Sequence, residues 1–455
     1  MTGSAVLASR AGGPAAPADH TLFVVDWDAA AADELQQQLN ALTGLTGPQA
    51  AGHASAPWQV LNCPSSTVQA GQGRNSLAHG LQTVRYLGTA ARAAWRSRYQ
   101  GQVVVWRQAI GYLLCALPRW PRWLCPSGHR PRLILTTVLL SPSSTAPRSW
   151  GRLLLELALR RADALVYFSR EMALDTARHR PAQAHKVFWM PLPQFGEPAG
   201  QAEPAAAPPP CPGRAPDDSL DNGPQEPGPT SDGRAVLSVF AGGTSDRDFD
   251  VVIEAFRDRP VPVILVCRED QRFRVPGPLG ANFSVHRGVS EARYHALAAA
   301  AGVVVVALKS SASGCGQLLF SFCMRHGIPV IATDCYGTRD DVIHGHTGWL
   351  VPPGDAQALA LAYDRLAADP VLRQDLVRHA RARALARARD LDLAAFVQAL
   401  QGLGQVLQGQ PSPCAPTSAA ALLQRTAADR ADDEPVQAPT PATPTRGSHP
   451  AREAA

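Results

Sequence analysis

Residues 327–334 read Gly-Ile-Pro-Val-Ile-Ala-Thr-Asp, and residues 348–355 read Gly-Trp-Leu-Val-Pro-Pro-Gly-Asp. Gly327 is suited to end a helix, and Pro329 prevents that helix from continuing. An apolar strand begins at Val330 and ends with Thr333-Asp334 at its carboxyl end. Because ligands of open α/β sheets bind outside the carboxyl ends of the strands, this stretch predicts an α/β domain with a binding site beside it.

The chain before this stretch repeats the alternation of strand and helix. An apolar strand over 236–240 is followed by a Gly-Gly turn, and a helix begins at Val251. Further apolar runs, which predict strands, lie at 263–266, 283–288 and 303–308. Such alternation is typical of a parallel sheet with covering helices.

This ordered set, over roughly residues 234–370, resembles the donor-sugar domain of retaining GT-B glycosyltransferases of family 4, the glycosyl transferases group 1. The resemblance implies an α/β fold with two Rossmann-like domains facing across a cleft. It also implies transfer of a sugar, with retention, from a nucleotide diphosphate sugar to a glycan or lipid-linked glycan. The nucleotide sugar is then a substrate, and no cofactor or metal is expected.

The resemblance also suggests where the donor binds. In the family a basic residue in the first turn meets the diphosphate, and here Gly243 and Arg247 occupy that turn. Gly314, Gly316 and Gln317 open a helix whose N-terminus suits a phosphate. The alternative interpretations are a turn that only changes direction and a flexible loop at a helix start.

Asp340 stands where the family often has a glutamate, and the resemblance suggests that Asp340 holds the sugar. Its alternative role is to cap a helix beginning there. The resemblance gives no catalytic role to His286, His344 or His346.

One departure from the family concerns catalysis. The family commonly has two glutamates eight positions apart, and here those positions are Gly314 and Phe322. No catalytic residue is therefore assigned. An alternative hypothesis is a non-catalytic GT-B-like protein that binds a nucleotide sugar or scaffolds polysaccharide assembly. A nucleotide-sugar epimerase is a third, but no clear set of first-domain acids or histidines supports it. The absence of a G-x-G-x-x-G fingerprint argues against an NAD enzyme.

Composition divides the chain into five segments. We expect a disordered N-terminus over 1–18, an acceptor domain over 19–195, a Pro/Gly-rich linker over 196–233, a donor domain over 234–408 that ends in a returning helix, and a disordered tail over 409–455.

Charge and cysteine usage indicate the surroundings of the protein. Residues 85–161 hold thirteen arginines and one acid, Glu156, with several tryptophans nearby. This composition suits an anionic membrane surface, although arginines selected by base composition on a solvated face are the alternative. No nucleic-acid motif accompanies the charge. The nine cysteines are scattered, and the sequence has neither a metal-ligand spacing nor a signal-peptide core. These features predict a cytoplasmic protein that is peripheral on the inner face of the cell membrane.

Overall fold

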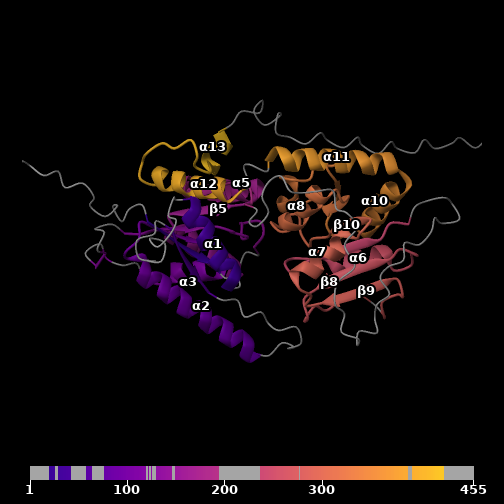
Figure 1. The fold of residues 1–455 in the computed structure, drawn as a ribbon, viewed down its shortest axis with the longest axis horizontal. Helices are drawn as coiled ribbons and strands as arrows, with labels where there is room; N and C mark the ends of the chain where they lie inside the picture. Colours follow the sequence, from indigo (N-terminus) through magenta and orange to yellow (C-terminus); the bar gives the residue numbers. More distant parts are fainter. Residues whose placement is uncertain are drawn as a thin grey trace, which may run out of the picture.

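A computed structural model describes residues 20–25, 29–42, 58–63, 76–118, 121, 124–125, 130–145, 149–193, 236–275, 277–387 and 392–424. These residues form two lobes side by side, each built on a twisted sheet with helices on both faces (Figure 1). The segments predicted to be a disordered N-terminus and a linker, 1–18 and 196–233, lie outside the described residues.

The first lobe contains a seven-stranded sheet with the order β13-β6-β5-β4-β3-β1-β2. Strands β1 to β6 pair in parallel, and β13 pairs with β6 in the antiparallel sense. The strands are β1 (Thr21–Val25), β2 (Trp58–Asn62), β3 (Gln102–Val105), β4 (Arg132–Leu135), β5 (Ala164–Tyr167), β6 (Val187–Trp189) and β13 (Thr417–Ser418).

Strands β1, β3 and β5 are mostly apolar and buried along their whole length, as expected of strands covered on both faces. The covering elements from the same part of the chain are α1 (Ala29–Leu42), α2 (Ser76–Ser97), α3 (Gln108–Ala116), α4 (Trp150–Arg161), α5 (Arg170–His179) and the 3₁₀ turn η4 (Pro181–Lys186).

The second lobe contains a six-stranded parallel sheet with the order β12-β11-β10-β7-β8-β9. Its strands are β7 (Val239–Gly242), β8 (Val263–Cys267), β9 (Phe283–Arg287), β10 (Val303–Val306), β11 (Val330–Thr333) and β12 (Trp349–Val351). Its helices are α6 (Phe249–Phe256), α7 (Glu291–Ala299), α8 (Gln317–His326), α9 (Tyr336–Arg339), α10 (Ala356–Ala368) and α11 (Pro370–Arg387). The expected strands at 236–240, 263–266, 283–288, 303–308 and 330–334 correspond to β7, β8, β9, β10 and β11.

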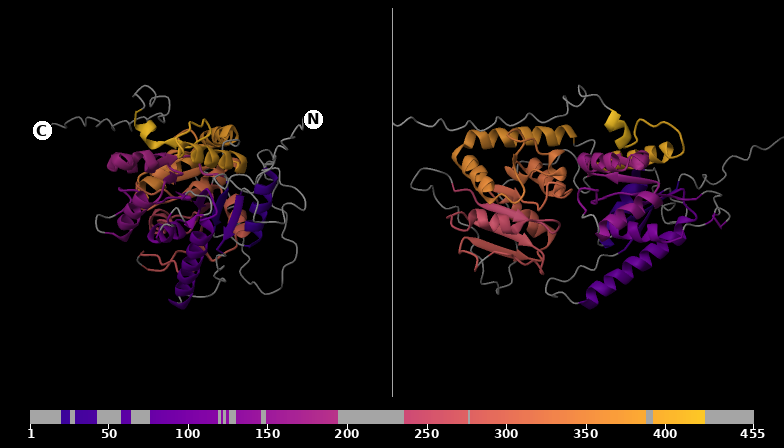
Figure 2. Two further views of the ribbon diagram at one scale, coloured as in Figure 1. Left: turned by 90° about the vertical axis from the view of Figure 1, so that its left-hand side faces the viewer. Right: turned by 180° about the vertical axis from the view of Figure 1, so that it is seen from behind.

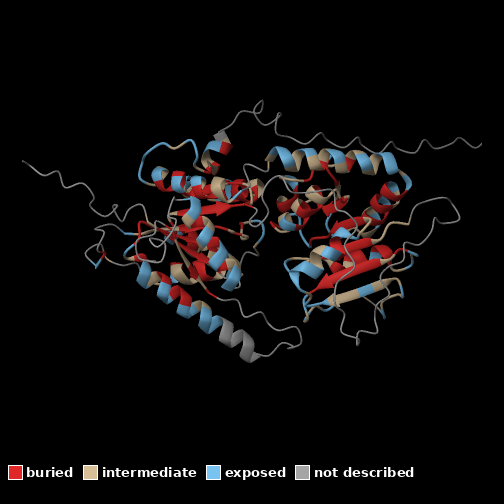
Figure 3. Ribbon diagram, in the orientation of Figure 1, coloured by how far each residue is buried: buried red, intermediate tan, exposed pale blue. Residues whose placement is uncertain are grey.

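Two clusters of buried hydrophobic residues form the core of each lobe. Figure 3 colours the buried residues red, and they include most of the strands. Gly327 ends α8 in the left-handed conformation at φ 72°, which glycine adopts without steric cost. Asp355 caps α10 by accepting a hydrogen bond from the Ala358 N–H.

The chain returns to the first lobe after α11. Phe396 and Leu400 of α12 (Leu393–Val406) are buried against Phe23 and other first-lobe residues. Figure 2 shows α12 on the first lobe while α11 lies along the second. The returning helix therefore packs on the first sheet.

The expectation of a disordered tail from residue 409 is wrong for residues 409–424. Strand β13 adds an edge to the first sheet, and α13 (Ala419–Gln424) follows it. Ala419 is fully buried and Leu422 is 4% exposed. The Pro-rich composition of the tail predicts disorder, but residues 409–424 are stabilised by their tertiary contacts with the first lobe. Residues 425–455 lie outside the described part.

Candidate functional site

The turn between β7 and α6 places Gly243 and Arg247 together. Gly243 has φ 130°, and a Cβ at this position would lie 2.5 Å from Arg247 Nε. The Arg247 guanidinium donates hydrogen bonds to Gly242 O at 2.8 Å and to Ser245 O at 2.9 Å. The turn therefore fixes the position of its own cation, and only glycine allows that cation to lie so close.

The second glycine loop precedes α8. Gly316 is the N-cap of α8 at φ 108°, and a Cβ there would lie 2.6 Å from the Phe320 ring. Gln317, the first residue of α8, is half-buried. The Leu319 N–H donates to Gly316 O at 3.0 Å, and the N-terminus of α8 carries the positive end of the helix dipole.

The structure brings these two elements together. Strands β7 and β10 are hydrogen-bonded neighbours, so the turn after β7 and the loop after β10 lie at the same edge of the sheet. Arg247 also forms a β-bridge with Leu308, just beyond β10. Burial raises the pKa of the Cys315 thiol, and the nearby Arg247 charge opposes that rise. Gly243, Arg247, Gly314, Gly316 and Gln317 thus form one neighbourhood, which we call the donor edge.

Asp340 has a different environment. Its Oδ2 accepts a hydrogen bond of 2.7 Å from the N–H of Arg170, the first residue of α5 in the other lobe. It lies at the C-terminal end of α9, so the alternative expectation that it caps a helix beginning there is wrong. It caps a helix of the first lobe instead.

Asp340 is half-buried, and this burial raises the pKa of its carboxyl group to about 7. The neighbouring carboxylates of Asp341 and Glu171 raise the pKa further, while the Arg170 N–H and the Arg387 charge oppose the rise. A carboxyl group with a pKa near neutrality changes its charge within the physiological range.

Phe322, at the position of the family's second glutamate, is buried between two imidazoles. Its ring stacks on His295 at a centroid distance of 4.6 Å and on His326 at 4.0 Å. Position 322 therefore contributes an aromatic stack and no carboxylate.

Two of the other histidines, His286 and His344, are half-buried. Burial lowers the pKa of His286 and of His344. The N–H of Leu350 donates to His344 Nδ1 at 3.1 Å, and His346 stacks on His379 at 4.0 Å. Both contacts stabilise the turn before β12.

Three residues of the first lobe that sequence reasoning missed lie at the beginning of α5. Ser169, its N-cap, donates from Oγ to Tyr336 O of the second lobe at 2.7 Å. Arg170 contacts Asp340 as described, and Met172 lies against Gly314. A serine before a helical segment predicts the cap, but nothing local in the sequence predicts its partner, 167 positions away.

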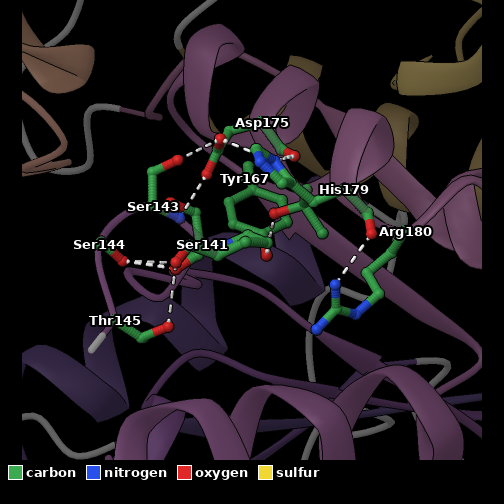
Figure 4. Close-up of polar contacts among 10 residues, drawn as sticks. Ser141, Ser143, Ser144, Thr145, Tyr167, Asp175, His179 and Arg180 are labelled. Carbon is green, nitrogen blue, oxygen red and sulfur yellow. Dashed lines mark hydrogen bonds and ion pairs between the residues drawn. The ribbon is translucent and has the colours of Figure 1, made fainter. Parts of the chain in front are cut away.

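A serine, an aspartate and a histidine also meet near the other end of α5 (Figure 4). Asp175 accepts hydrogen bonds from the Ser143 N–H at 2.9 Å and from its Oγ at 2.6 Å, and His179 Nδ1 lies 3.2 Å from the same carboxylate. The aspartate stands between the other two, so the histidine has no contact with the serine through which to take its proton. The cluster fastens the 141–145 loop to α5.

Helix α2 presents three large apolar side chains among its described residues to solvent. Val84 is 63% exposed, Leu87 48% and Trp95 53%, whereas Ala90 and Ala93 face the core. Among the described residues no helix is both long enough and apolar enough to cross a bilayer.

Residues 278–383, in the second lobe, match the family model described as Glycosyl transferases group 1. No curated protein matches the chain. The matched segment contains the second glycine loop, α8, α9 and Asp340.

Solved structures show the same fold. HepE from Anabaena in complex with UDP and glucose is similar at 16% identity and a TM-score of 0.52, over 86% of this chain and 100% of that chain. Sucrose-phosphate synthase from Thermosynechococcus elongatus is similar at 17% identity and a TM-score of 0.52, over 86% and 98%. The expected α/β fold of the GT-B type is confirmed.

Proposed function

We propose that this protein is a glycosyltransferase that moves a sugar, with retention, from a nucleotide diphosphate sugar to a glycan or lipid-linked glycan. The observation that carries the proposal is the donor edge. A fixed arginine and a helix N-terminus meet at the carboxyl ends of two adjacent parallel strands. The group 1 family match supports the same chemistry.

Each part of the donor edge has a role in this proposal. The Arg247 guanidinium neutralises the diphosphate as it leaves, and the N–H groups at the start of α8 bind phosphate or sugar oxygens. Retaining transfer needs no conventional enzymic base, because positioning and stabilisation of the leaving diphosphate supply much of the rate. UDP is the first nucleotide to test, since the similar HepE structure contains it.

The acceptor reaches the site from a membrane in this proposal. Helix α2 has no acidic residue, and its exposed apolar side chains are flanked by Arg85, Arg92 and Arg96. The Arg98 guanidinium stacks on Trp95 at 3.7 Å. Apolar and cationic side chains on one helix face suit an anionic lipid surface, to which the first lobe would dock beside a lipid-linked acceptor.

A second candidate function is nucleotide-sugar binding without transfer. The observation that favours it is the stack around Phe322, which replaces a family carboxylate with a buried ring. The two candidates share the donor edge and differ in whether the bound sugar is transferred.

Calorimetric titration of the whole chain with UDP, GDP and ADP tests the proposal. We expect one diphosphate to bind, and Arg247→Ala to weaken that binding by about 1–3 kcal/mol, the scale of a charge-assisted contact. Arg378→Ala is the control, because Arg378 is an exposed arginine of α11 paired with Asp375. Equal affinity of the Arg247→Ala variant and wild type would remove Arg247 from the site.

A further inference from the structure

The first turn of α5 contacts the second lobe at three separate points. The Ser169 hydroxyl donates to Tyr336 O, the Arg170 N–H donates to Asp340 Oδ2, and the Met172 side chain lies against Gly314. Both hydrogen bonds are 2.7 Å long. Two of these contacts reach α9, and the third reaches the loop that leads into α8.

Gly314 leaves room for a residue of the other lobe. Any side chain at position 314 would overlap Sδ of Met172, which is itself 1% exposed. The backbone of Gly314 is not in the left-handed region, in contrast to Gly316. The close approach of Met172, and not the local backbone conformation, is therefore what requires glycine at position 314.

Asp340 brings a carboxylate to the N-terminus of α5. The Arg170 N–H is one of the donors that a helix cannot satisfy internally, and a carboxylate is stabilised at that end of the helix dipole. Arg383 donates to the Asp340 carbonyl at 2.8 Å, which fixes the backbone that presents this carboxylate. The hydrogen bond between Arg170 and Asp340 forms only when the lobes are in contact, because its donor and acceptor belong to different lobes.

Helix α9 connects this contact to the donor edge. The Tyr336 N–H donates to Ser311 O at 2.9 Å, and the Gly337 N–H donates to Ser313 O at 2.8 Å. A Cβ at position 337 would lie 2.6 Å from Cys315 O, so the loop packs directly on α9. The same short helix thus holds α5 through Tyr336 and Asp340 and supports the loop that ends at Gly316.

We infer that the first turn of α5 is a docking joint, and that Ser169, Met172 and Asp340 are positioning residues which set the shape of the 311–316 loop for phosphate binding. The inference rests on the proposed function for the ligand, because it assumes that this loop meets the nucleotide diphosphate. It adds that the first lobe controls the affinity of the second lobe for that ligand. The joined lobes bind the diphosphate tightly, and separation of the joint loosens the loop.

A double-mutant cycle tests the contact between the lobes. Gly314→Ala, Met172→Ala and the double variant of the whole chain are titrated with UDP, GDP and ADP, and the radius of gyration is measured by small-angle X-ray scattering. We expect Gly314→Ala to lower affinity about tenfold and to increase the radius of gyration. Removing the Met172 side chain clears the overlap, so the double variant should recover to within about threefold of Met172→Ala.

A second pair of variants covers the case in which Met172→Ala fails to fold. Ser169→Ala removes the N-cap at the joint, and Ser149→Ala removes the N-cap of α4, which is another helix of the first lobe. We expect Ser169→Ala to weaken diphosphate binding at least fivefold and Ser149→Ala to leave it within twofold of wild type. A similar fall in both variants would reduce Ser169 to an ordinary cap and contradict the joint.

The outcomes separate this inference from the proposed function. If wild type binds none of the diphosphates, the proposed function fails, while scattering still reports whether Gly314→Ala separates the lobes and Met172→Ala restores them. If wild type binds but Gly314→Ala and Ser169→Ala bind equally well, the joint does not control the loop. If Gly314→Ala weakens binding and the double variant shows no recovery, the effect of position 314 is local and the inference is overturned.

Discussion

At the scale of single residues, the donor edge depends on two glycines that serve different purposes. Gly243 adopts φ 130°, which favours glycine, and has Arg247 Nε 2.5 Å from its missing Cβ, so a side chain there would have to displace the guanidinium. Gly314 is required for space alone. The sequence indicates that both positions matter, because glycines follow strands there. The sequence does not show which residue packs against each glycine or why glycine is needed, because Met172 approaches Gly314 only in the folded chain.

Gly243→Ala should therefore affect ligand binding as well as stability. The added methyl group displaces the Arg247 guanidinium and forces alanine into a left-handed region, which costs on the order of 1–3 kcal/mol. We expect at least a tenfold loss of diphosphate affinity. Gly354→Ala is the matched control, because Gly354 also has positive φ (71°) but nothing lies within 4 Å of its missing Cβ. Calorimetry and thermal denaturation of both variants distinguish strain from displacement of the cation.

Asp340 predicts a pH dependence of stability. Its pKa is about 7 in the folded chain and ordinarily near 4. The folded state therefore binds the proton more tightly, so the free energy of unfolding falls as pH rises from about 4 to 7 and then levels off. Asp340→Asn keeps an acceptor for the Arg170 N–H but cannot ionise. We expect the stability of the variant relative to wild type to rise by on the order of 2–3 kcal/mol between pH 5 and pH 8.

Urea denaturation at pH 5 and pH 8 measures this difference. Asp375→Asn, at a surface ion pair of α11, is the control and should show no such divergence. If the difference in unfolding free energy between wild type and Asp340→Asn is the same at pH 5 and pH 8, the pKa of Asp340 is not raised in the folded chain.

At the scale of elements, α2 shows that helical periodicity does not decide which face of a helix is buried. Periodicity places Val84, Leu87, Ala91 and Trp95 on one stripe, and such a stripe usually faces the core. Here the small residues Thr89, Ala90 and Ala93 face inward instead. Small side chains allow α2 to approach its neighbours closely, and this packing requirement is invisible in hydrophobic periodicity.

The outward apolar stripe predicts lipid binding that depends on α2. Each arginine contributes about 1 kcal/mol near an anionic bilayer, and that attraction decays over a Debye length of ~8 Å at physiological salt. Binding to vesicles with anionic lipid should fall as salt rises. Leu87→Ser and Trp95→Ser should each weaken it severalfold in co-sedimentation.

Leu361→Ser is the control for this experiment, since Leu361 is 60% exposed on α10 in the other lobe. Equal binding to neutral vesicles, or no effect of the α2 variants, would leave the stripe without a role at membranes.

At the scale of the whole molecule, the two-sheet architecture could be predicted from the alternation of strands and helices and from the family resemblance. The joint between the lobes could not, because it is made by a serine, a backbone N–H and a glycine whose partners are far away in sequence. The segment 409–424 was also missed, because its local composition resembles a tail.

Removal of residues 409–455 should destabilise the first lobe. Ala419 and Leu422 are buried, and their loss removes apolar contacts and the β13 pairing. We expect the 1–408 chain to lose about 2–4 kcal/mol of stability relative to the 1–424 chain. Urea denaturation of the two truncated chains and the full chain measures this. Equal stability of 1–408 and 1–424 would show that the segment contributes nothing.

The central claim is that a sugar leaves its nucleotide diphosphate at the donor edge. Phosphorus NMR can follow the release of UDP, GDP or ADP from the corresponding nucleotide sugars in the presence of the whole chain and lipid-linked acceptor. We expect release of one diphosphate that depends on the protein and is slowed about 100-fold in Arg247→Ala, the scale for losing one electrostatic stabiliser of the leaving group. Tight binding of a nucleotide sugar that stays intact would contradict transfer and favour the non-catalytic alternative.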